Sequence, residues 1–150
     1  MISVFYEGYN NQAERDIIDS ASEFAAAKLF PRFKVDITFR FIKDLKEKEK
    51  IEGDVVFLDD SYRPRDFIVR VHKGLAKDDL ITLVMHEFVH IKQYMRKELY
   101  FKFDKKKWTY KVHFKGRNVD NVKYLDQPHE KEAYRLQEKL YNEYINFINI

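Results

Sequence analysis

The segment from Asp78 to about Lys97 constrains the fold more than any other part of the chain, because apolar residues recur in it at helical spacing. An amphipathic helix of this kind is stable in water when other elements cover its apolar face. Asp78 or Asp79 is the expected N-cap, since a short acidic side chain accepts hydrogen bonds from free amides there. The expected packing residues are Leu80, Ile81, Leu83, Val84, Phe88 and Ile91.

Hydrophobic periodicity predicts further elements on both sides of this central helix. Helices are expected over residues 11–30 and from Pro128 onward, strands over 33–42, 55–58 and 67–72, and a two-stranded hairpin over 99–114. Residues 1–6 form either a short strand or a loosely ordered end, 43–52 a solvated loop or exposed helical turn, and 59–64 a turn. The order predicts a single α+β domain over 1–150, with the strands in one small mixed sheet against the helices.

Composition excludes several kinds of chemistry and location. The 150 residues contain no cysteine, so disulfides, iron–sulfur clusters and thiol catalysis are excluded, and a bound metal needs His, Asp or Glu ligands. No apolar run is long enough for a membrane span, and the start of the chain lacks a signal-peptide pattern. We therefore expect a cytoplasmic protein without a membrane partner. The net charge of +3 does not by itself indicate nucleic-acid binding.

The central helix contains the sequence H-E-x-x-H, as His86-Glu87-Phe88-Val89-His90. Residues four apart lie on one face of a helix, so the two imidazoles can reach one zinc ion at about 2.0–2.1 Å. Glu87 lies about 100° further around the helix, where it is free to act as a general base toward water. The alternative is a buried histidine pair satisfied by hydrogen bonds, but the apolar helical context favours the zinc site.

A catalytic zinc site needs a third protein ligand and an open fourth position. The central helix does not continue into the Gly and third His of the metzincins. His113 in the hairpin and His129, Glu130 and Glu132 at the start of the last helix are the remaining choices. Glu130 and Glu132 differ by about 200° around that helix, so only one of them can face the metal.

The HEFVH motif followed by Pro-x-Glu-x-Glu-Ala resembles the gluzincin zinc peptidases, in particular the small minigluzincins and the SprT-like and ImmA/IrrE-like proteins of phages and bacteria. The resemblance implies a zincin-like fold and a zinc-dependent peptidase, with Glu130 as the third ligand and Ala133 as the small residue of the second motif. Two features depart from the pattern. Tyr134 stands where these families place an Asp or Asn that orients a ligand histidine, and the cysteine-rich zinc ribbon of some SprT-like proteins is absent.

These residues predict hydrolysis of a peptide or protein substrate. Zinc lowers the pKa of its water and polarises the scissile carbonyl, while Glu87 takes the water proton and returns it to the leaving amine. Tyr124 is the favoured oxyanion donor, with Tyr110 and His113 as alternatives. The strand over 67–72 is expected at the edge of the cleft, where it pairs with an extended peptide. A non-catalytic zincin-fold binding or regulatory module is the alternative function.

The hairpin region over residues 97–123 has nine basic and three acidic residues, interleaved with aromatic ones. Such a surface can contact phosphates and stack on bases, which points to nucleic acid as a further partner through Lys105, Lys106, Lys107 and Lys111. A SprT-like protease associated with DNA is the corresponding function. The alternative is a ribbon with one face packed on the core and lysines solvating the other.

Overall fold

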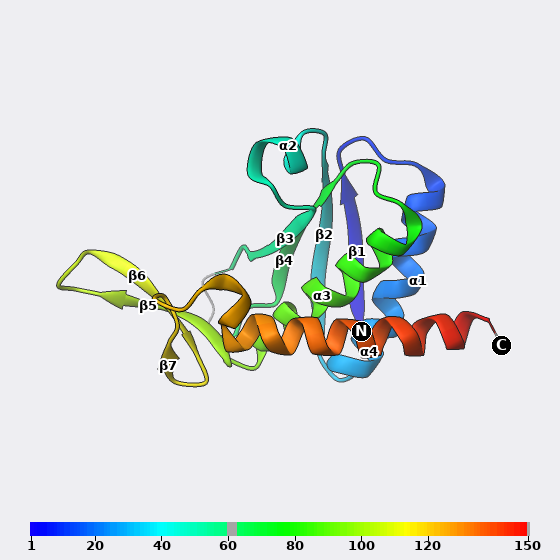
Figure 1. Ribbon diagram of the computed structural model, residues 1–150. Helices are drawn as coiled ribbons and strands as arrows, with labels where there is room; N and C mark the ends of the chain where they lie inside the picture. The colour runs from blue at the N-terminus through cyan, green and yellow to red at the C-terminus, as the bar shows by residue number, and fades with distance from the viewer. Residues whose placement is uncertain (60–62, 150) are drawn as a thin grey trace.

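The predicted central helix is α3 (Lys77–Met95), which crosses one face of a sheet and is buried along most of its length (Figure 1). The structure is a computed structural model that describes residues 1–59 and 63–149. The expected N-cap was wrong, because Ala76 occupies that position and makes no side-chain cap. Asp78 and Asp79 lie in the first turn instead, where their charges interact favourably with the helix dipole. The turn expected over 59–64 includes residues 60–62, which lie outside the described residues.

The main sheet has four strands in the order β1-β2-β4-β3. Their bounds are β1 (Ile2–Glu7), β2 (Val35–Ile42), β3 (Gly53–Phe57) and β4 (Asp66–His72). The first two pairs, β1 with β2 and β2 with β4, are parallel, whereas β3 pairs antiparallel with β4. The expectation that the strand over 67–72 forms the edge was wrong. That strand is β4, in the interior of the sheet, and the edge strands are β1 and β3.

Alternating side chains give this sheet one apolar face, and the helices cover it. Every second residue of β2 is buried, beginning at Val35, and the others are partly or fully exposed. Helices α1 (Gln12–Leu29) and α3 pack against one another, and α4 (Pro128–Ile148) packs along α3. Phe88 of α3 stacks its ring on Phe30 and Phe39. The central helix α3 is therefore packed between the sheet and α4, as its apolar pattern predicts.

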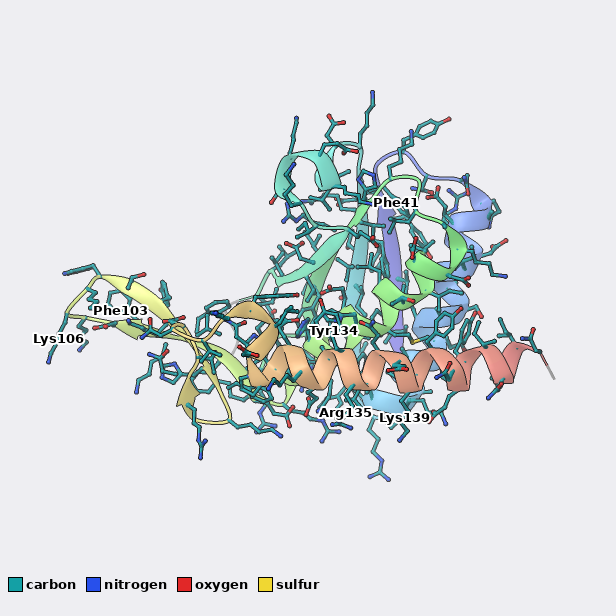
Figure 2. The ribbon with its side chains drawn as sticks, in the orientation of Figure 1. Phe41, Phe103, Lys106, Tyr134, Arg135 and Lys139 are labelled. Atoms are coloured by element: carbon teal, nitrogen blue, oxygen red, sulfur yellow. The ribbon has the colours of Figure 1, made fainter. Side chains whose placement is uncertain are left out.

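The predicted hairpin is present, but it does not join the main sheet. Strands β5 (Leu99–Asp104) and β6 (Thr109–Phe114), with the short β7 (Arg117–Asn118), form a second sheet. Its base is anchored by a small cluster of Leu99, Phe114 and Val119. Its tip projects away from the body of the molecule, where Phe103 and Lys106 are labelled (Figure 2). The expectation of a single sheet was therefore wrong.

Two short helical segments complete the described chain, α2 (Leu45–Glu49) and the 3₁₀ turn η1 (Tyr124–Asp126). The first is the exposed helical turn expected within residues 43–52. Asn11 caps α1 and exchanges hydrogen bonds with Glu14, a reciprocal arrangement that fixes where this helix begins. Among the described residues, no helix combines the length and the apolar character needed to cross a membrane.

Candidate metal centre

His86 and His90 lie one turn apart on the face of α3 that meets α4. Their ring nitrogens Nε2 are 3.2 Å apart, and both side chains are buried. The i, i+4 spacing places the two imidazoles on the same face of the helix. The packing of α3 against α4 shields this face from water, so two polar rings meet inside the protein rather than at its surface.

Glu130 brings a carboxylate to these two imidazoles from the first turn of α4. Its Oε1 is 3.1 Å from His86 Nε2 and 3.2 Å from His90 Nε2. Among the described residues, these three form the one group whose ligand atoms could hold a metal ion. Glu132 is directed elsewhere, to Lys92 and Gln93, and His113 is not part of the group.

Two glutamines hold the imidazoles in position from the side opposite Glu130. Gln93 donates its amide hydrogens to the His129 carbonyl oxygen and to Glu132, so its Oε1 is left to accept from His90 Nδ1 at 2.8 Å. His86 Nδ1 donates to Gln137 Oε1, also at 2.8 Å. With an Nδ1 hydrogen used in this way on each ring, loss of the Nε2 proton leaves a lone pair that faces Glu130 on both rings. This is the tautomer that binds a metal ion.

Neither glutamine was singled out from the sequence. Gln93 follows His90 by three residues and Gln137 follows Glu130 by seven, so helical spacing placed both on the faces that meet at the site. Tyr134 does not replace the missing Asp or Asn as a hydrogen-bond partner of a ligand. Its ring packs edge-on against His86, with 4.7 Å between the ring centres, and Gln137 holds that imidazole instead.

The charges of the three grouped side chains depend on one another. Burial raises the pKa of Glu130, but hydrogen bonds from His86 and His90 outweigh it and hold this pKa well below the usual range. Burial lowers the pKa of His90, yet its hydrogen bond with Glu130 and the charge of Glu87 leave the pKa raised. Both pKa shifts have the same cause, because a buried carboxylate is stabilised by positive charge beside it.

Glu87 points into the same buried region without being part of the group. It is 5% exposed, and its carboxylate has no hydrogen-bond partner among the described residues. Burial raises its pKa, and the neighbouring His90 and His86 only partly oppose this effect. A raised pKa means that this carboxyl group holds a proton more readily than an exposed glutamate does.

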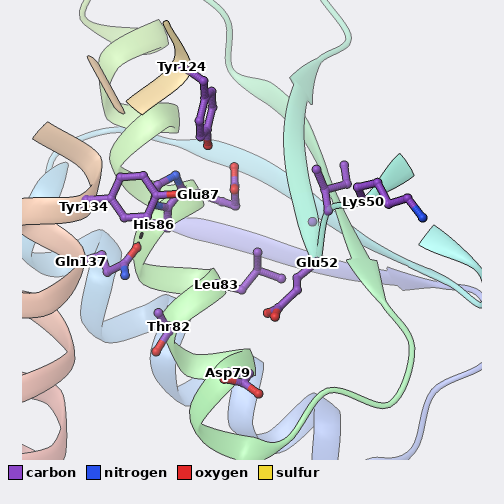
Figure 3. A pocket seen from close by; sticks show the side chains of 12 residues that line it. Lys50, Glu52, Asp79, Thr82, Leu83, His86, Glu87, Tyr124, Tyr134 and Gln137 are labelled. Atoms are coloured by element: carbon purple, nitrogen blue, oxygen red, sulfur yellow. Dashed lines mark hydrogen bonds between the residues drawn. The ribbon is translucent and has the colours of Figure 1, made fainter. Parts of the chain in front are cut away.

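Tyr124, the predicted oxyanion donor, lies beside the group at the start of η1. Its hydroxyl donates to Glu130 Oε1 at 3.1 Å, and half of its side chain is exposed. Figure 3 shows this hydroxyl and the Glu87 carboxylate directed toward the same space beside His86. The alternatives Tyr110 and His113 lie in the hairpin, and neither lines the cavities at the group.

His129 is buried next to the group but does not join it. Its Nε2 is 3.9 Å from Glu130 Oε2, and its Nδ1 has no hydrogen-bond partner within the described chain. The ring lies between His90 and Phe114. Burial lowers its pKa, so the imidazole is neutral at pH 7.

Two adjoining cavities open onto the grouped side chains. One of about 580 Å³ extends toward the N-terminal end of α3, and one of about 330 Å³ extends toward the second sheet. Both are lined by Gly53 of the edge strand β3, by Glu87 and by Tyr124. A side chain at Gly53 would collide with the Arg70 carbonyl oxygen and with Leu83, so glycine lets β3 pass close to α3 here.

No known protein-family model matches this chain, and no curated protein is significantly similar to it in sequence. The fold and the site therefore define a general class of protein and not a particular family. It is a mixed α+β domain with a buried His-His-Glu group that could hold a metal ion.

Proposed function

We propose that the protein is a zinc-dependent peptidase. The observation that carries this proposal is the juxtaposition of three metal-ligating side chains with the separate, unpaired Glu87 carboxylate. A structural metal site has no need of a free acid beside it, whereas peptide hydrolysis needs a general base. The resemblance of the HEFVH and Pro-x-Glu-x-Glu-Ala motifs to the gluzincins supports the same function.

Zinc suits the donor set better than a hard cation does. Calcium and magnesium prefer ligand sets made of oxygen, whereas two imidazoles and one carboxylate are typical of zinc enzymes. Atoms bound tetrahedrally at about 2.0–2.1 Å are themselves about 3.3 Å apart. The observed separations of 3.1–3.2 Å are close to this value, so the group accommodates the ion with little movement.

When bound, zinc supplies the Lewis acidity that activates water and polarises a carbonyl group. The protein's own residues then handle protons and charge. Glu87 takes a proton from the attacking water and delivers it to the leaving amine. The Tyr124 hydroxyl donates to the oxygen of the scissile carbonyl as negative charge develops on it. The second of these roles requires the hydroxyl to leave Glu130, which its exposed position allows.

The substrate binds in an extended conformation along β3. Within the described chain this strand pairs with β4 alone, so its other backbone edge can pair with a peptide. Gly53 in this strand lines both cavities together with Glu87. A peptide added to this edge would therefore pass in front of the group, with its carbonyl groups within reach of the metal.

The direct test is cleavage of an unstructured protein such as casein with and without metal. We expect the zinc-loaded protein to cleave it, activity to disappear after chelation, and stoichiometric zinc to restore it. Gel electrophoresis and mass spectrometry of the fragments measure the cleavage. Zinc binding without cleavage of casein or of a diverse peptide library would instead favour the non-catalytic binding or regulatory module.

A second candidate function, contact with nucleic acid, is favoured by the outer half of the hairpin. Both of its faces are exposed rather than packed on a core. Trp108 is 84% exposed, and Phe103 contacts both Trp108 and Tyr110. The exposed lysines Lys105, Lys106 and Lys107 lie in the same turn. Positive charge beside exposed rings suits phosphates and unpaired bases.

If the hairpin contacts DNA, we expect DNA to stimulate cleavage of a DNA-bound protein substrate. The triple variant K105E/K106E/K107E should lose this stimulation but keep its activity on a free peptide, because the hairpin tip lies away from the cleft. The control variant K43E/K46E/K48E makes the same change in net charge at exposed lysines near α2. Equal loss in both triple variants, or no stimulation of the parent by DNA, would rule out this interface.

A further inference from the structure

The larger of the two cavities is acidic at the end away from the metal ligands. Glu52 and Asp79 line it beside Thr82 and Leu83 (Figure 3). Neither carboxylate has a hydrogen-bond or ion-pair partner among the described residues. Lys50 also borders this cavity, but Figure 3 shows its side chain extending away from both carboxylates. This end of the cavity therefore presents two carboxylates that no basic side chain pairs with among the described residues.

A pair of acidic side chains alone does not identify a ligand, but the buried Glu87 carboxylate opens onto the same cavity. Buried polar groups normally have a partner, and Glu87 has none within the described chain. A peptide that reaches Glu87 for hydrolysis occupies this cavity, and the negative charge at the outer end favours a cationic side chain there. Glu52 and Asp79 do not belong to a metal-ligating group, which points to an organic cation.

The smaller cavity, on the other side of the grouped side chains, has an apolar end by contrast. Tyr94, Leu99, Phe101 and Val112 line the part of it that lies toward the second sheet. Asp54 also borders it, but Arg70 forms two hydrogen bonds with that carboxylate and neutralises it. This side of the cleft suits a large apolar side chain rather than a charged one.

We infer that the two cavities together select peptides with a basic residue on one side of the bond that is cut and a large apolar residue on the other side. A Lys or Arg side chain within two residues of that bond lies in the acidic cavity, between Glu52 and Asp79. A large apolar side chain within two residues on the other side of the bond lies in the apolar end of the smaller cavity. This inference rests on the proposed peptidase function and adds the substrate class to it.

The test compares two peptides that differ only at one position, which is lysine in one and norleucine in the other. We expect the zinc-loaded protein to cleave the lysine peptide with a kcat/KM roughly tenfold higher, as two charge-assisted contacts in a half-enclosed cavity would give. The double variant E52Q/D79N should lose this preference and cleave the lysine and norleucine peptides at similar rates. The control variant E23Q/D36N makes the same charge change outside both cavities and should keep the preference.

Binding provides a second readout that does not depend on turnover. Fluorescence anisotropy with labelled peptides and the zinc-loaded E87Q protein should show the same preference for lysine, and adding E52Q/D79N should remove it. Cleavage of both peptides at equal rates, or a preference that survives E52Q/D79N, would overturn the inference while the peptidase function stands. Tighter binding of the lysine peptide without cleavage of any peptide by the parent would support the cavity's selectivity and contradict the peptidase function.

Discussion

Replacing Glu87 with glutamine is expected to abolish measurable peptide hydrolysis and leave zinc bound. Glutamine has nearly the same shape but cannot accept the proton of the attacking water. General acid–base catalysis contributes roughly 10²–10⁴-fold, so kcat/KM should fall by at least 100-fold. The Glu87 carboxylate makes no hydrogen bond to His86, His90 or Glu130, so the metal ligands should be undisturbed. A fluorogenic peptide assay and metal analysis by mass spectrometry measure both quantities on the same preparation.

The matched control is E138Q, which makes the same substitution at an exposed position on α4. This variant should retain both activity and zinc. Activity of E87Q above a tenth of the parent value would remove Glu87 from the role of general base. Loss of zinc together with activity would mean that Glu87 supports the metal site instead.

The elements with a complete hydrophobic pattern could be predicted from the sequence. The burial of α3 and the alternation of β2 are local consequences of residue spacing, and both were predicted close to their observed bounds. The order of strands in the sheet depends on contacts between distant segments. For this reason β4 was taken for an edge strand although the edges are β1 and β3, and the hairpin was placed in the main sheet.

The same division between local and distant information applies to the candidate site. The placement of His86, Glu87 and His90 follows from helix geometry alone. The third ligand had to come from another element, and the sequence alone left His129, Glu130 and Glu132 as choices at the start of α4. Packing of α4 on α3 brings Glu130 to the imidazoles and leaves Glu132 with Lys92 and Gln93.

Removing a ligand is expected to have the second large effect, on metal affinity. The parent should bind one equivalent of zinc, and H86A or E130Q should weaken binding by more than about 100-fold, since even outer partners of zinc ligands contribute roughly 10–100-fold. Zinc at 100 times its Kd should stabilise the parent by about 2.7 kcal/mol and raise Tm by roughly 5–10 °C. Neither variant should show this increase. Competition with a chromophoric chelator and thermal melting followed by circular dichroism measure the two effects.

Two control variants separate the ligands from residues that are merely near them or of the same type. E132Q tests the other carboxylate at the start of α4, and it should keep the zinc and the increase in Tm because Glu132 lies against Lys92 and Gln93. H113A removes an imidazole from the hairpin and should also leave binding unchanged. A melting curve of each metal-free variant establishes that it folds. Full zinc binding by a folded E130Q protein, or equal loss in E132Q, would show that the carboxylate ligand is not Glu130 alone and would require a different metal centre.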